Sequence, residues 1–155
     1  MRLRRRPMTL RDAQPCAQLI ASHPLESKRY GKLAEQLPSA WKQCLRNGSL
    51  ISAVLEDMES GKPSLQAFGV SVFVTDEFLH SCKMPRMRWM GPELVRCLIR
   101  GDSPVLGPKA IRDANSTGGL NLASWASILC PRNETDRAQV QIELFTAFMQ
   151  EHCGF

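Results

Sequence analysis

A strand that runs directly into a long helix is the feature that most constrains the fold of this chain. Residues 120–129 are largely apolar and follow Gly118 and Gly119, which indicates a buried strand that begins after a break in the chain. Pro131 ends this strand, and a helical pattern extends from there to about His152. A helix joined so closely to a buried strand needs a sheet to pack on, so we expect a fold that combines α and β structure.

The final helix is predicted to be amphipathic. Apolar residues recur on it at helical spacing and form one stripe, made of Ala138, Ile142, Phe145 and Met149, with Leu144 and Phe148 beside it. Gly154 is a residue type that commonly ends a helix. Because the chain stops at Phe155, where a turn into another strand would follow, we expect a truncated fold that is one part of a longer protein.

The first 46 residues predict one strand and two helical regions. Arg2–Met8 has the pattern of a short strand. Thr9, with Asp12 three residues later, predicts the capped start of a helix that ends near His23. The second helical region covers residues 25–46 and is predicted to be interrupted near Pro38.

An antiparallel hairpin follows, with strands at Ser49–Glu56 and Ser64–Thr75. In the second strand, alternate residues from Phe68 to Val74 are apolar and share one face. Residues 76–117 then lack a clear strand pattern and contain four prolines. We interpret them as an irregular helical insert that serves as a lid or partner surface, with short helices at about 92–100 and 108–114.

Together these elements predict a single domain over residues 1–155. Its fold class is α/β (α+β): a mixed, mostly antiparallel sheet flanked by helices. A chain of this length can bury a sizeable core without disulfides. No apolar run approaches the roughly 20 residues of a membrane helix. The basic N-terminus has no apolar stretch of a secretory signal behind it, so we expect a cytoplasmic protein.

The positive charge of the chain is localised. Five of its 20 basic residues lie in the first 11, which contain no acid, so 15 basic and 15 acidic residues remain beyond them. A second basic cluster has Glu93 as its only acid and consists of Lys83, Arg86, Arg88, Arg96 and Arg100. Each cluster is either solvated surface or an anion site for a nucleotide, CoA or nucleic acid. The pattern of a DNA-binding helix-turn-helix is missing, so nucleic acid is not the expected partner.

The cysteines and histidines do not predict a metal site. The six cysteines form no C-x-x-C pair, and the three histidines lie far apart in the sequence. We therefore expect reduced, partly buried thiols and no metal.

The order of the predicted elements resembles the first half of the GNAT superfamily of N-acetyltransferases. Leu3–Ala13 looks like the first strand and helix start of that family, and Leu50–Thr75 looks like its second and third strands. Leu120–Leu129 is similar to the fourth strand, and Asn133–Gly154 to the helix after it. The resemblance implies acetyl-CoA or another acyl-CoA as acyl donor and an amine as acceptor.

The resemblance also implies positions for the acyl-CoA. In that family, backbone groups of the fourth strand pair with pantetheine, and the following turn wraps the pyrophosphate. Carried over by position, the pantetheine would lie along Ser127, Ile128 and Leu129, and the pyrophosphate at Arg132, Asn133 and Thr135. The turn at residues 130–136 has none of the family's glycines and contains Glu134 and Asp136, which also fit the first turn of a helix.

Two carboxylates follow the third predicted strand. The family often has a general base near this position, so the resemblance implies a catalytic role for Asp76 and Glu77. The alternative interpretation of the same pair is structural: acids favour the first turn of a helix that begins after a strand.

Two functions therefore remain open. The first is an acyl-CoA-dependent N-acyltransferase, with a carboxylate such as Glu77 as base and a small-molecule amine as substrate. The second is a non-catalytic ligand-sensing or protein-interaction module of a longer regulatory protein. The second function predicts an exposed apolar patch or an open sheet edge, through which a homodimer could form.

Overall fold

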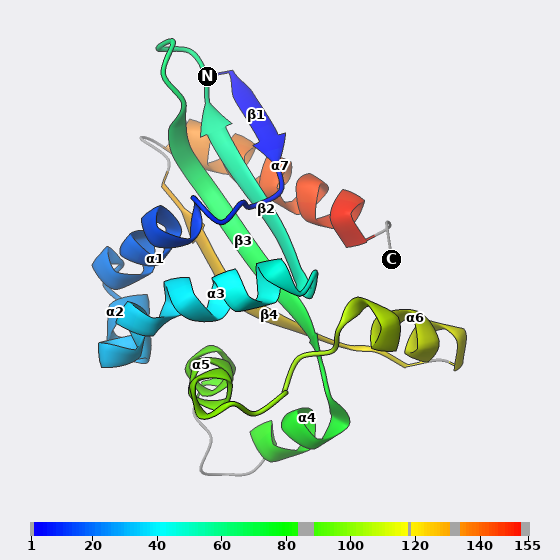
Figure 1. Ribbon diagram of the computed structural model, residues 1–155. Coiled ribbons are helices and arrows are strands. Elements are labelled where there is room, and N and C mark those ends of the chain that lie inside the picture. The colour runs from blue at the N-terminus through cyan, green and yellow to red at the C-terminus, as the bar shows by residue number, and fades with distance from the viewer. Residues whose placement is uncertain (1, 84–88, 118, 131–133, 153–155) are drawn as a thin grey trace. The chain divides into compact units, whose positions relative to one another are not determined.

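The computed structural model describes residues 2–83, 89–117, 119–130 and 134–152 (Figure 1). It divides into two compact units. Unit 1 comprises residues 1–8, 51–70 and 126–155, and unit 2 comprises residues 9–50 and 71–125. The combination of helices with an antiparallel sheet confirms the predicted fold class. The prediction of one domain over the whole chain stays a prediction.

Four strands of the described residues form one sheet in the order β1-β2-β3-β4. They are β1 (Leu3–Arg6), β2 (Leu50–Asp57), β3 (Ser64–Val74) and β4 (Asn121–Leu129). β1 pairs antiparallel with β2, with Arg4 opposite Glu56. The strand order follows the chain order, so each strand lies beside its neighbour in sequence, as the predicted hairpin requires.

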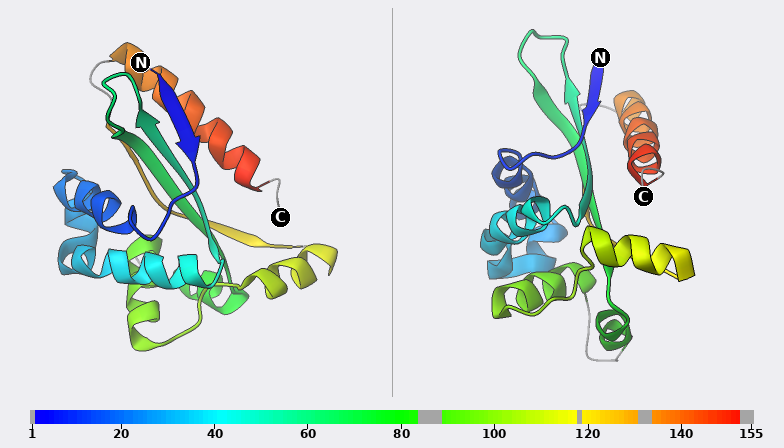
Figure 2. Two further views of the ribbon diagram at one scale, coloured as in Figure 1. Left: turned by 45° about the horizontal axis from the view of Figure 1, so that its top comes forward. Right: turned by 45° about the vertical axis from the view of Figure 1, so that its right-hand side comes forward.

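Unit 1 contains helix α7 (Glu134–His152), which packs against strands of this unit (Figure 2). The shared core consists of alternate residues on the strands and one side of the helix: Ala53, Leu55, Ala67, Val140, Leu144 and Ala147. The ring of Phe148 lies directly over Gly69, in space that a side chain on that glycine would fill. Gly69 therefore allows α7 to approach the sheet closely.

The packing face of α7 differs from the apolar stripe that the sequence predicted. Ile142, Phe145 and Met149 are 66%, 67% and 50% exposed, whereas Val140 and Leu144 are buried. The periodicity of the helix places these two stripes on opposite sides. Helix α7 thus carries two apolar stripes, and the one with Val140, Leu144 and Ala147 occupies the core. Gly154, its predicted end, lies outside the described residues.

Unit 2 contains the remaining helices (Figure 1). They are α1 (Ala13–Ser22), α2 (Glu26–Tyr30), the 3-10 helix η1 (Gly31–Gln36), α3 (Leu37–Arg46), α4 (Asp76–Cys82), α5 (Met90–Arg100) and α6 (Pro108–Thr117). Helix α1 packs against α2, η1 and α3, and α5 packs against α3. The last three helices lie within residues 76–117, where the sequence predicted short helices at about 92–100 and 108–114.

The core of unit 2 is built around Trp41 of α3, which is fully buried. Its ring meets that of Trp125 on β4 edge to face, with ring centroids 6.3 Å apart. Aromatic rings prefer this geometry because the positive edge of one faces the negative face of the other. Both tryptophans therefore belong to the core.

Two predicted helix boundaries were wrong in detail. The α-helix α1 begins at Ala13 and not at Thr9, although the Asp12 carboxylate accepts hydrogen bonds from the Thr9 N–H and hydroxyl, both at 2.7 Å. Pro38 does not interrupt a helix but lies in the first turn of α3, where its missing N–H costs nothing. The interruption is η1, which begins at Gly31 with a φ of 52°.

A buried carboxylate joins the first two strands in unit 1. Glu56 is 8% exposed and accepts hydrogen bonds from Arg4 Nη2 at 2.6 Å and Arg6 Nη2 at 2.7 Å. The Arg6 hydrogen bonds, supported by those of Arg4, hold the pKa of Glu56 below its usual range. Arg5, on the opposite face of β1, pairs with Glu143 of α7 at 2.7 Å. Strand alternation thus gives each of these arginines a structural partner.

We predict that Glu56→Gln lowers the free energy of unfolding at pH 7 by about 1–2 kcal/mol, since charge-assisted hydrogen bonds are lost and Arg4 is half exposed. The folded pKa of Glu56 is depressed, so its contribution is complete above its unfolded pKa of about 4.3 and is lost as pH falls through the folded pKa. The wild type and the variant should therefore converge in stability at acidic pH. Urea denaturation at a series of pH values measures this, with the exposed Glu35→Gln as control. A gap that persists unchanged at pH 2 would contradict the prediction.

Candidate functional site

The two predicted catalytic carboxylates lie at the start of α4, directly after β3. Thr75 caps this helix: its hydroxyl oxygen accepts a hydrogen bond from the Phe78 N–H at 3.2 Å. Asp76 and Glu77 occupy the first turn, where acids stabilise a helix. The structural interpretation of the pair is therefore confirmed as far as the helix is concerned, and their catalytic role stays a prediction.

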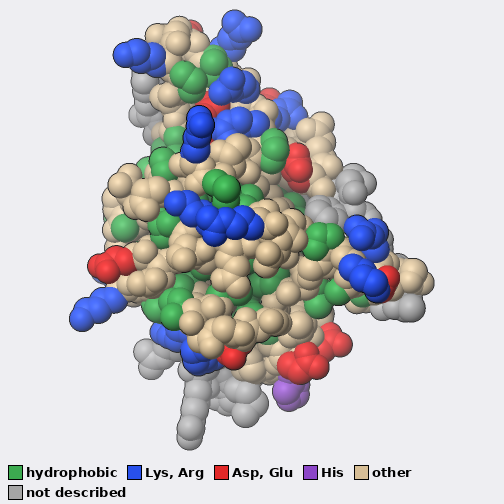
Figure 3. Space-filling model, in the orientation of Figure 1, with side chains coloured by type: hydrophobic (Ala, Val, Ile, Leu, Met, Phe, Trp, Pro, Cys, Tyr) green, Lys and Arg blue, Asp and Glu red, His purple; other side chains and the backbone are tan. Residues whose placement is uncertain are grey.

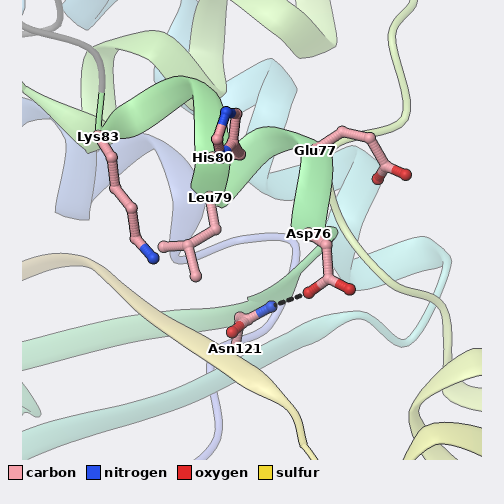
Figure 4. A pocket seen from close by; sticks show the side chains of 6 residues that line it. All are labelled: Asp76, Glu77, Leu79, His80, Lys83 and Asn121. Carbon is pink, nitrogen blue, oxygen red and sulfur yellow. Dashed lines mark hydrogen bonds between the residues drawn. The ribbon is translucent and has the colours of Figure 1, made fainter.

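The same two residues also line two adjoining pockets of unit 2. The larger pocket has a volume of about 640 Å³ and is open, and its lining consists of Asp76, Glu77, Leu79, His80, Lys83 and Asn121 (Figure 4). The smaller pocket, of about 270 Å³, shares Asp76, Glu77 and Asn121 with the first and is otherwise lined largely by apolar residues of β3, α6 and the segment between α5 and α6. A charged wall and an apolar wall therefore meet at the start of α4.

Asp76 and Glu77 do not point at a common target. Figure 4 shows the Asp76 carboxylate facing Asn121, whereas the Glu77 side chain extends away from it. Neighbouring residues on a helix project in different directions, so two adjacent carboxylates cannot both face one ligand atom. Asn121 Nδ2 donates to Asp76 Oδ1 at 2.6 Å and fixes this carboxylate. Asp76 is therefore the better placed of the two predicted bases.

Four of the pocket residues were not assigned to this site from the sequence: Leu79, His80, Lys83, which was named only in a basic cluster, and Asn121. Asp76, Leu79 and Lys83 recur at i, i+3 and i+7, so they share one face of α4, and this spacing was a usable signal. Figure 4 shows all three on the side of Asn121. Asn121 lies 45 residues away from Asp76 in sequence, and only the pairing of β3 with β4 brings it close.

The residues predicted to line pantetheine lie at the end of β4, in unit 1. Ser127 is exposed, Ile128 is buried, and Leu129 is half-buried against the core beneath α7. β4 is the last strand of the described sheet, so its outer edge has no strand partner among the described residues. The predicted pyrophosphate residues Arg132 and Asn133 lie outside the described residues, as does the side chain of Thr135.

One carbonyl of β4 is already occupied in unit 2. The buried Tyr30 hydroxyl donates to the Trp125 carbonyl oxygen at 3.0 Å. Burial raises the pKa of Tyr30, and the nearby Glu26 adds to this effect, so the hydroxyl stays protonated. Gly91, in the first turn of α5, lies against this hydroxyl, and a Cβ on Gly91 would also lie 3.0 Å from the Trp125 oxygen. Tyr30 is thus a packing residue that closes part of the β4 edge.

The basic clusters are largely paired with acids. In the second cluster, Arg96 lies 2.8 Å from Glu93, and Arg100 lies 3.0 Å from Asp102. Arg86 and Arg88 lie outside the described residues. The face seen in Figure 3 shows basic side chains in separate groups and not in one continuous field. These pairs favour the interpretation as solvated surface.

Trp89 is the one tryptophan that is largely exposed. It precedes α5, and the Arg29 guanidinium of α2 lies over its ring, 4.4 Å from the centroid. Arg29 is also paired with Glu26 at 2.5 Å. Stacking of this kind is a cation–π contact between two neighbouring helices, and it gives Trp89 a structural partner.

Four of the five described cysteines are poor nucleophiles. Burial raises the pKa of the Cys44 thiol to about 12, and it also raises the pKa of Cys82, Cys97 and Cys130. The thiolate is the reactive form, so these residues stay in the unreactive form at neutral pH. Among the described residues, no group of three or more His, Cys, Asp or Glu could hold a metal ion. None of the described helices combines the length and the apolar character needed to cross a membrane.

Comparisons with family models, with curated proteins and with solved structures give no match for this chain.

We predict that Tyr30→Phe costs about 1–2 kcal/mol of stability, because the buried Trp125 carbonyl loses its donor. Gly91→Ala should cost about 1–3 kcal/mol through overcrowding of the Tyr30 hydroxyl. In the double variant the added methyl group gains the space of the lost hydroxyl. The losses in free energy of unfolding of the two single variants should therefore sum to more than the loss in the double variant. Urea denaturation of the wild type, the two single variants and the double variant measures this. Strict additivity would contradict the packing that we describe.

Proposed function

We propose that this chain is an acyl-CoA-dependent N-acyltransferase-like domain whose amine substrate binds at the start of α4. The observation that carries the proposal is the Asp76 carboxylate, which is fixed by Asn121 at 2.6 Å and faces an open pocket. This carboxylate lies after the third strand, where the resemblance to N-acetyltransferases implies a general base. The proposal assigns the base role to Asp76 in preference to Glu77, because Glu77 extends away from Asn121 (Figure 4).

Asp76 would act in two steps. An amine is an ammonium ion at neutral pH, and a carboxylate binds that ion and accepts one of its protons. Asn121 holds Oδ1, and no described residue donates a hydrogen bond to Oδ2, so this oxygen is the one that would accept the proton. The neutral amine nitrogen would then form a bond to the acyl carbon as the carbon–sulfur bond of the acyl-CoA breaks. The departing thiolate would take up the proton that the nitrogen loses and leave as the CoA thiol.

The face of α4 also defines a class of amine. Asp76, Leu79 and Lys83 follow each other along this face, over about 10 Å of helix. The order is a carboxylate, an apolar side chain and an ammonium group. An amine with an apolar middle and an anionic far end would meet an opposite charge at each end. The substrate class is therefore an ω-amino acid or a similar amine that carries an anion.

We predict that Asp76→Asn lowers kcat/KM for acyl transfer by about 100-fold or more, because the variant cannot accept a proton. Glu77→Gln is the matched control and should change kcat/KM by less than about threefold, which is within the scatter expected for a side chain without a direct role. Release of the CoA thiol from acetyl-CoA measures the rate. Equal losses in the Asp76 and Glu77 variants would contradict the assignment of the base.

Lys83→Met should raise KM for 6-aminohexanoate and leave KM for hexylamine unchanged.

A ligand-sensing module is the second candidate function, and the glycine-free turn at residues 130–136 favours it. This function predicts that amines bind at Asp76 but that no acyl transfer follows. Thermal shift with acetyl-CoA, with desulfo-CoA and ATP as controls, separates the two functions. A ligand at 100 times its Kd adds roughly 2.7 kcal/mol of stability, or several degrees in Tm. A shift with 6-aminohexanoate alone supports sensing, and no shift with any ligand contradicts both functions.

A further inference from the structure

Helix α7 presents an apolar stripe that nothing in the described residues covers. Ile142, Phe145 and Met149 are at least half exposed, and Ala138 continues their line toward the start of the helix. The opposite side of α7 already fills the core of unit 1. Three large apolar side chains in one line on one helix are more than scattered exposure, so this surface, which we call the α7 stripe, is expected to meet a partner.

The spacing of the α7 stripe identifies the shape of that partner. Its four residues are separated by four, three and four positions. This is the alternation of a coiled-coil seam, in which side chains of one helix insert between those of another. A flat sheet or a loop would not match that spacing. The partner is therefore another helix.

The residues beside the α7 stripe indicate which helix fits. Its flanks are uncharged and consist of Gln139, Gln141, Thr146 and Phe148. Charges at these flanking positions normally select the partner of a coiled coil, and like charges oppose self-pairing. With uncharged flanks, the same helix of a second molecule can approach without repulsion.

The α7 stripe is also complementary to itself when it runs antiparallel. A two-fold axis through its centre places Ile142 opposite Phe145, and Phe145 opposite Ile142. The same alignment places the small Ala138 opposite the long Met149 at both ends. Each layer therefore combines a smaller and a larger side chain, which fills space evenly.

We propose that two copies of this chain form a dimer through an antiparallel pair of α7 helices. This inference goes beyond the proposed acyltransferase function and does not depend on it. The contact covers about three helical turns, which is small beside the about 1,200–2,000 Å² of a stable interface. The dimer is therefore a weak one, whose population rises with protein concentration.

Sedimentation velocity over a wide range of protein concentrations tests the proposal. The wild type should shift from monomer to dimer, and Phe145→Glu should raise the dimer Kd at least tenfold, since it buries a charge without a partner. Leu25→Glu is the matched control, because Leu25 is 60% exposed and belongs to unit 2, not to α7. It should leave the dimer unchanged. Circular dichroism checks that each variant is folded, and Phe145→Gln replaces Phe145→Glu if the latter does not fold.

A second pair of variants tests the antiparallel alignment. Ala138→Met alone should weaken the dimer, because two methionines then meet in the outer layers. Adding Met149→Ala restores one small and one large side chain in each layer and should recover most of the wild-type Kd. A wild type that is monomeric at every concentration overturns the proposal. A dimer that Phe145→Glu leaves intact, or one that the double variant does not restore, overturns it as well.

Discussion

The burial of β3 is the constraint on which the rest of the structure depends. Every residue from Gln66 to Val74 is buried, although alternate side chains of a strand point to opposite faces. A strand in this state needs apolar cover on both faces, and a short hairpin cannot supply it. The chain therefore uses its helices for that cover: α7 packs on strands of unit 1, and the core of unit 2 is centred on Trp41 and Trp125.

The candidate site follows from where β3 ends. The antiparallel pairing of β3 and β4 brings the end of one strand beside the start of the other. Asp76 and Asn121 occupy those two positions, which is why residues far apart in sequence share a hydrogen bond. A polar pair at the ends of two neighbouring strands, of which β3 is buried and β4 is exposed at alternate residues, has solvent beside it and the apolar interior behind. That position suits the binding of a molecule with both polar and apolar parts.

Sequence reasoning was most reliable where the pattern is local. The strands, the hairpin and the helices of residues 76–117 were predicted from periodicity, turn residues and proline, because these act within a few positions of the chain. The residue types of Asp76 and Glu77 gave a helix start as one of two interpretations for the same reason, whereas Thr75, which caps α4, was expected to end the strand. The sequence could not identify Asn121 as the partner of Asp76, nor could it show that Glu77 turns away, since both depend on contacts between distant elements.

Helix α7 shows both what the sequence alone determines and what only the tertiary structure decides. The sequence by itself determined that residues 134–152 form a helix and that Ile142, Phe145 and Met149 line one side of it, because helical periodicity is a local property. The sequence did not determine which side packs. Gly69 and the small side chains of β2 and β3 leave room for Val140, Leu144 and Ala147 together with the ring of Phe148, so the tertiary structure buried that side and left the other stripe exposed. Steric fit to a neighbouring surface made that choice, and only the folded chain contains that surface.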